Sequence, residues 1–164
     1  MKKGFLMAVA AFAFGFANAQ EVKYGAKAGA DFTSAAIKIG DSNTGFYVGG
    51  FADVAVSEII HVQPELLYVS VKDINQIQIP VFARFPIVED FSLLAGPNFR
   101  FVLNGGTSLK TVNFGMDFGA SFDVSDDFSL DAKYNWGVTN LIKGGSSQND
   151  FKLSGLFFGL GYKF

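Results

Sequence analysis

After residue 20 the chain divides into eight segments in which apolar and polar side chains alternate with a period of two. Side chains on one face of a β-strand recur with this period, whereas those on one face of a helix recur about every 3.6 residues. Glycines occur throughout the segments, and the prolines lie in or at the end of them, which also disfavours helices. The pattern therefore predicts eight strands, which cover approximately residues 23–33, 44–54, 59–69, 76–86, 91–102, 111–124, 127–139 and 152–164.

The two faces of each predicted strand differ in charge. In segment 127–139, one face carries Leu130 and Trp136, and the other carries Asp131 and Lys133. Every segment has one face without a charged residue, although about a quarter of the residues of an ordinary protein are charged. We therefore expect the uncharged faces to meet an apolar environment and the charged faces to meet one another.

Segment 44–54 is the least regular of the eight. Tyr47 and Phe51 share the face of Asp53, so both of its faces contain large apolar side chains. We assign the uncharged set to the apolar environment, namely Phe46, Val48, Gly50, Ala52 and Val54.

The connections between the segments alternate in length. Three are short, at residues 55–58, 87–90 and 125–126, and four are longer, at residues 34–43, 70–75, 104–110 and 140–151. Short turns at one end and longer loops at the other are typical of outer-membrane barrels. The sequence thus predicts an all-β protein, an eight-stranded antiparallel up-and-down transmembrane β-barrel with both termini on the short-turn, periplasmic side.

The first residues resemble an export signal. Lys2 and Lys3 precede an apolar run from Phe5 to Phe16, and small residues follow at Ala17 and Ala19, which is the order found in a secretory signal peptide. We expect residues 1–19 to be the signal peptide and residues 20–164 the outer-membrane barrel domain. Beyond Ala19 no apolar run reaches the length of a spanning helix, and a closed barrel is the other structure that satisfies its backbone within a bilayer.

The charged faces predict a salt-bridged interior. An eight-stranded barrel is only wide enough for its own side chains, and buried charges are tolerated when they are paired. The inward sets hold equal numbers of cations and anions, which favours an internal network that plugs the lumen. The residues expected in it are Lys23, Lys27, Asp31, Asp53, His61, Glu65, Arg84, Arg100, Asp117, Asp123, Asp131, Lys133 and Lys163.

Aromatic residues gather near the ends of the uncharged faces. Rings with one polar and one apolar side prefer the boundary between lipid and water, where they form girdles around transmembrane barrels. We expect such a girdle to contain Tyr24, Tyr68, Phe91, Phe122, Phe128, Trp136 and Tyr162.

Several short stretches resemble the outer-membrane barrels common in Bacteroidetes, of the PorT-like or "porin family" kind. They are Gly25–Phe32, Gln78–Phe85, Leu94–Pro97, Tyr134–Asn140 and Gly159–Phe164. The resemblance implies an outer-membrane location and a barrel fold, and a PorT-like member would have a part in type IX secretion. Phe164 resembles the C-terminal aromatic signal of such barrels, which implies the barrel-assembly machinery as a partner through the last strand.

Residues that could carry out catalysis or bind a metal are few. His61 is the only histidine, and Glu65 on the same face of the strand is roughly 13 Å away, too far for a hydrogen bond. There is no cysteine, and the carboxylates lack the spacing of a calcium loop. No basic stripe suggests nucleic-acid binding. We therefore expect no enzyme activity, including lipid modification, and no cofactor or metal.

Three functional hypotheses follow from these patterns. The first is a structural or interaction barrel of the cell envelope, surrounded by outer-membrane lipid and open to an envelope protein partner. The second is a narrow barrel that binds or conducts a small solute. The third is a soluble lipocalin-like barrel, in which the charged faces would lie outside and the aromatic faces inside.

Overall fold

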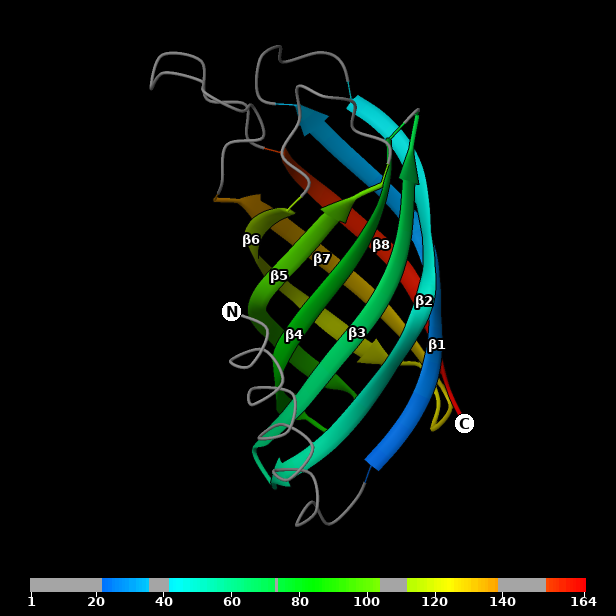
Figure 1. Ribbon diagram of the computed structural model, residues 1–164. Coiled ribbons are helices and arrows are strands. Elements are labelled where there is room, and N and C mark those ends of the chain that lie inside the picture. The colour runs from blue at the N-terminus through cyan, green and yellow to red at the C-terminus, as the bar shows by residue number, and fades with distance from the viewer. Residues whose placement is uncertain (1–21, 36–41, 73, 104–111, 139–152) are drawn as a thin grey trace.

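A computed structural model describes residues 22–35, 42–72, 74–103, 112–138 and 153–164. These residues form eight antiparallel strands in a closed barrel, in which each strand pairs with the next and β8 closes against β1 (Figure 1). The predicted fold is therefore confirmed. Among the described residues no helix is long and apolar enough to cross a membrane. The strands are β1 (Val22–Ala35), β2 (Ser42–Ser57), β3 (Ile60–Val71), β4 (Ile74–Val88), β5 (Phe91–Val102), β6 (Val112–Asp123), β7 (Phe128–Gly137) and β8 (Leu153–Lys163).

The strands run obliquely to the barrel axis (Figure 1). A path of paired residues that starts at Val22 passes once around the barrel and returns to β1 at Phe32, ten residues further along. With eight strands, this stagger corresponds to a strand tilt of roughly 40°, as in other closed barrels. Residues that meet inside the barrel therefore often lie on strands that are not neighbours.

The connections near the chain termini are short, as predicted. β2 and β3 are joined at residues 58–59, β4 and β5 at residues 89–90, and β6 and β7 at residues 124–127. The register shifts between Ala55 and Ser57 and between Pro86 and Val88, just before two of these turns.

One predicted connection was wrong. The sequence indicated a longer loop over residues 70–75, but Ser70 pairs with Asn75 and Val71 pairs with Ile74, so the strands continue almost to the turn. Lys72 has a φ of 51°, the left-handed backbone that tight hairpins use. Polar residues in this stretch suggested a loop, although they belong to paired strand ends. The predicted signal peptide and most of the other three long connections lie outside the described residues.

The outer and inner faces divide as the alternation predicts. Along β7 the burial changes at every residue, with Leu130 and Trp136 exposed and Asp131 and Lys133 buried. Val54 is an exception on the outer face, because it is only 2% exposed between its partners Val22 and Val62.

The lumen also contains an apolar cluster, which the charge pattern did not emphasise. Tyr47 and Phe157 contact each other with ring centroids 5.8 Å apart, and Leu67, Val69 and Val71 complete the cluster. It lies on β2, β3 and β8, toward the end of the barrel away from the chain termini. The interior is thus packed by apolar side chains as well as by charges.

Candidate functional site

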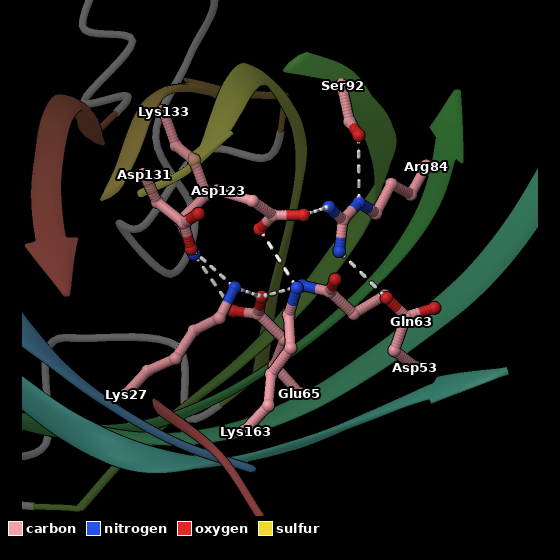
Figure 2. A network of polar contacts seen from close by, with 10 residues as sticks. All are labelled: Lys27, Asp53, Gln63, Glu65, Arg84, Ser92, Asp123, Asp131, Lys133 and Lys163. Carbon is pink, nitrogen blue, oxygen red and sulfur yellow. Dashed lines mark hydrogen bonds and ion pairs between the residues drawn. The ribbon is translucent and has the colours of Figure 1, made fainter. Parts of the chain in front are cut away.

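The most distinctive feature of the molecule is a network of charged side chains in the lumen (Figure 2). Its ten residues come from all eight strands, so every strand of the barrel wall contributes to it. They form two groups: a central group around Glu65, and a mouth group around Arg84 near the short turns. The residues are Lys27, Asp53, Gln63, Glu65, Arg84, Ser92, Asp123, Asp131, Lys133 and Lys163.

The central group is fully enclosed. Glu65 accepts hydrogen bonds from Lys27 at 2.7 Å, from Lys133 at 2.9 Å and from Gln63 at 2.7 Å. Lys27 also donates to Asp131. The side chains of these four charged residues are at most 3% exposed, and two cations face two anions. Their charges therefore balance where water is excluded, which is the condition under which buried ions are tolerated.

Aromatic rings extend the central group. The ammonium of Lys27 lies 4.7 Å from the centre of the Phe51 ring, and that of Lys133 lies 5.1 Å from the centre of the Phe82 ring. The ammonium of Lys133 is also 5.6 Å from the centre of the Tyr47 ring. A desolvated cation gains further stabilisation from such ring faces. The inward aromatic residues and the charged network are thus parts of one packed interior.

The mouth group lies between the central group and the short-turn end. Arg84 donates to Asp53 at 2.8 Å, to Asp123 at 2.7 Å and to Ser92 at 3.0 Å. Lys163 on the last strand donates to Asp123 at 2.9 Å. Arg84 uses Nε, Nη1 and Nη2 for three acceptors on three strands, and the compact ammonium of a lysine would not spread its donors in this planar way.

Two further predicted residues lie at this mouth. His61 Nδ1 is 2.7 Å from a carboxylate oxygen of Asp53, and its side chain is 28% exposed. Lys23 is exposed at the rim. Both residues line a hollow of about 150 Å³ that opens at the short-turn end.

A third polar group lies further from the termini. Asp117 accepts hydrogen bonds from Asn98 at 2.8 Å and from Asn135, and Asn98 also donates to Gln78 at 2.9 Å. Arg100 is buried at 5% exposure, and Asp117 is one of the carboxylates that attract it. The other is Asp31, which is fully buried. These amides were not singled out from the sequence, although their alternation places them on the inward faces.

The expected girdle residues all lie on the outer face, in two groups. Tyr24, Phe91, Phe122, Phe128 and Tyr162 are near the short-turn end, whereas Tyr68 and Trp136 are nearer the other end. The rings of Phe128 and Tyr162 are 4.9 Å apart, and Tyr162 contacts Phe164 at 5.6 Å. Phe164 is 79% exposed, and its backbone N–H donates to the carbonyl of Tyr24.

The short-turn mouth of the lumen contains a histidine, an aspartate and a serine, the residue types of a serine hydrolase, but the serine is hydrogen-bonded to an arginine and the histidine to the aspartate. His61 and Asp53 form a hydrogen-bonded pair, and Ser92 lines the same hollow. A serine nucleophile requires a base that can take its proton. The side chain that Ser92 meets is Arg84, which stays protonated and can only donate. Ser92 therefore serves to orient Arg84 in this structure.

The described residues contain no group of three or more histidine, cysteine, aspartate or glutamate side chains that could hold a metal ion. The carboxylates of Asp53, Glu65 and Asp123 are instead paired with lysine and arginine side chains. The arrangement stabilises the barrel and fills its cross-section.

Comparison with known families identifies the chain. Residues 5–164 match the model of the outer membrane protein beta-barrel domain. The chain belongs to this outer-membrane barrel family. The match agrees with the closed eight-stranded fold and makes the protein a small outer-membrane barrel. No curated protein matches the sequence.

Solved structures with the same fold include natural and designed barrels. Neisserial surface protein A is 18% identical, with a TM-score of 0.56, and the match covers 87% of this chain and 97% of that one. Ail, the attachment invasion locus protein of Yersinia pestis, is 19% identical with a TM-score of 0.55, over 88% of this chain and all of that one. A barrel from the de novo design of transmembrane beta-barrels is 15% identical with a TM-score of 0.58, over 87% and 95%. At these identities the similarity establishes the fold.

Proposed function

We propose that this outer-membrane barrel has a closed lumen and acts as a structural or interaction component of the cell envelope. The observation that supports the proposal is the network of ion pairs and hydrogen bonds, to which every strand contributes. Such a network crosses the lumen from wall to wall, and the apolar cluster around Tyr47 and Leu67 fills the next layer. A solute would have to break several buried ion pairs to pass.

The proposal includes an orientation. Both described chain ends and the short turns lie at the same end of the barrel (Figure 1). In the usual layout of outer-membrane barrels this end faces the periplasm, so the long connections would face outward and contact any partner. The exposed Phe164, next to Tyr162, supports recognition of the last strand by the barrel-assembly machinery.

A narrower role in type IX secretion rests on the resemblance to PorT-like barrels alone.

A narrow solute-binding barrel has one specific observation in its favour, the hollow of about 150 Å³ beside His61 and Arg84. A small polar molecule in this hollow would meet balanced charges, with the enclosed Lys27–Glu65 pair beyond it. The hollow therefore favours binding at the mouth over passage through the barrel.

Single-channel conductance in planar bilayers distinguishes a closed from a conducting barrel. We expect the wild-type protein to insert without conductance steps, and Glu65→Ala combined with Lys133→Ala to produce them, because this pair of changes removes side chains from the centre of the lumen while keeping the charge balanced. Glu58→Ala, in an exposed turn, is the control and should remain closed. Steady conductance of the wild-type protein would contradict a closed lumen.

A further inference from the structure

An apolar groove of about 350 Å³ interrupts the outer surface of the barrel over β5 to β8. Its floor is formed by Ala120 and Ala132, which pair directly across β6 and β7. Because an alanine side chain ends at Cβ, the larger neighbours project beyond it on both sides. These neighbours are Phe91, Phe122, Leu130 and Phe158.

A second hollow, of about 460 Å³, lies at the short-turn rim next to the β6–β7 turn. Its lining includes Lys23, Asp126 and Asp127, and these three residues are exposed. The rings of Tyr24 and Phe164 also line it. Lys163 lines it as well, so the hollow combines two cations, two carboxylates and aromatic surface within one concave site.

The groove and the hollow lie next to successive parts of the same segment, the β6–β7 turn and β7. The turn that carries Asp126 and Asp127 continues directly into Phe128 and Leu130, and Leu130 is roughly 10 Å along the strand from Asp127. Phe128 packs against Tyr162 beside this path. Exposed aromatic rings at this height are typical of the membrane interface. The hollow therefore lies at the level of lipid headgroups, and the groove lies within the hydrocarbon.

We propose that the groove and the hollow together bind one phospholipid that carries a primary amine, of the phosphatidylethanolamine class. The phosphate would lie toward Lys23, the ammonium toward Asp126 and Asp127, and one acyl chain along the Ala120–Ala132 floor. The two signs of charge explain the choice of headgroup, because the lysines attract the phosphate and the carboxylates attract an ammonium, which phosphatidylglycerol lacks. The inference goes beyond the closed-lumen proposal and concerns the outer wall of the barrel and its short-turn rim.

Native mass spectrometry of the protein released from nanodiscs of equimolar phosphatidylethanolamine and phosphatidylglycerol tests this site. We expect the wild-type protein to retain phosphatidylethanolamine preferentially. Asp126→Asn combined with Asp127→Asn should reduce this preference by about fivefold per carboxylate removed. Ala132→Trp should fill the groove and lower the retention of both lipids. The matched control is Ala83→Trp, on the outer face of β4 outside the groove, which should retain lipid as the wild type does.

Each variant is read only after a boiling-dependent mobility shift has shown that it is folded. The turn substitutions are in exposed positions, so they test the headgroup site even if Ala132→Trp does not fold. Equal retention of the two lipids by the wild type, or an unchanged preference in the double Asp variant, would overturn the proposal. A dimer that disappears in Ala132→Trp would assign the groove to a second copy of the chain instead. Because lipid retention is measured independently of conductance, an open lumen would leave this result unaffected.

Discussion

At the scale of single residues, Glu65 is the acceptor at the centre of the lumen. Its carboxylate takes hydrogen bonds from two lysines and a glutamine, on three different strands including its own. The side chain is completely buried. Its negative charge, together with that of Asp131, balances the charges of Lys27 and Lys133 inside the barrel.

Glu65→Gln tests this role with almost no change in volume. The substitution leaves Lys27 and Lys133 with Asp131 as the remaining carboxylate in their group, so one buried cation lacks an anion. We expect the free energy of unfolding to fall by about 3–5 kcal/mol, as when one partner of a buried pair is removed. Urea-induced unfolding in lipid vesicles measures it. The control is Glu58→Gln, in an exposed turn, which should change the free energy of unfolding by less than about 0.5 kcal/mol. An equal effect of the two substitutions would mean that Glu65 is not essential to the network.

Gly159 explains how a tyrosine fits inside so narrow a barrel. A Cβ added at Gly159 would overlap the hydroxyl of Tyr47 and would lie 2.7 Å from the carbonyl oxygen of Ala28. Gly29, opposite Gly159 on β1, leaves room for the same ring. The inward glycines thus create the space that the apolar cluster occupies.

Gly159→Ala should therefore destabilise the barrel by about 1–3 kcal/mol, the usual cost of overpacking. Gly50→Ala is the matched control, because the nearest atom to its added Cβ is the Gly25 carbonyl oxygen at 3.4 Å, an ordinary contact. Urea unfolding of both variants under the same conditions gives the comparison. If Gly159→Ala were as stable as Gly50→Ala, Tyr47 would not be fixed against β8.

At the scale of strands, the alternation along β7 predicts how a charged residue on its outer face would change the stability of the barrel. Leu130 is exposed on the outer face, between the aromatic girdle and the middle of the strand. Leu130→Arg should lower the stability in bilayers by roughly 2–4 kcal/mol, because it places a cation in hydrocarbon. Glu58→Arg, in the exposed β2–β3 turn, is the control and should have little effect. Unchanged stability of Leu130→Arg in vesicles would show that this face of β7 does not contact lipid.

The strands themselves could be predicted from the sequence, but one of their connections could not. The alternation predicted eight strands whose ends agree with the structure to within a few residues in the described parts of the chain. The β3–β4 connection was predicted as a loop because Ser70, Lys72 and Asn75 are polar. Polar residues are equally suited to the solvated end of a hairpin, and the left-handed backbone of Lys72 is not apparent from its residue type.

At the scale of the whole molecule, the sequence predicted which charges face inward but not which of them meet. Lys27 and Asp131 are separated by 104 residues, and they come together because β8 closes the barrel against β1 with a particular stagger. Stagger is a property of the closed sheet, so single-strand patterns do not contain it. The same limit applies to Arg84, which contacts Asp53 and Asp123 on strands that are not neighbours of each other.

The apolar part of the lumen was missed for a related reason. Tyr47, Leu67 and Phe157 lie on faces that were recognised by their charges, and large apolar side chains on those faces were not weighed as a second core. The lipid groove likewise depends on two alanines becoming neighbours across β6 and β7. Both features arise from side-chain size at positions that only the register brings together.

The assignment of the outer and inner faces is tested most directly by measuring which aromatic side chains contact lipid. The chain has one tryptophan, Trp136, which is 57% exposed on the outer face, whereas Phe82 is completely buried in the lumen. Fluorescence quenching by brominated phospholipids is measured for the wild-type protein and for Phe82→Trp in a Trp136→Phe background, each folded in vesicles. We expect strong quenching of Trp136 and almost none of the lumen tryptophan. Quenching of the lumen tryptophan with an unquenched Trp136 would mean that the faces are reversed and that the barrel does not contact lipid as described.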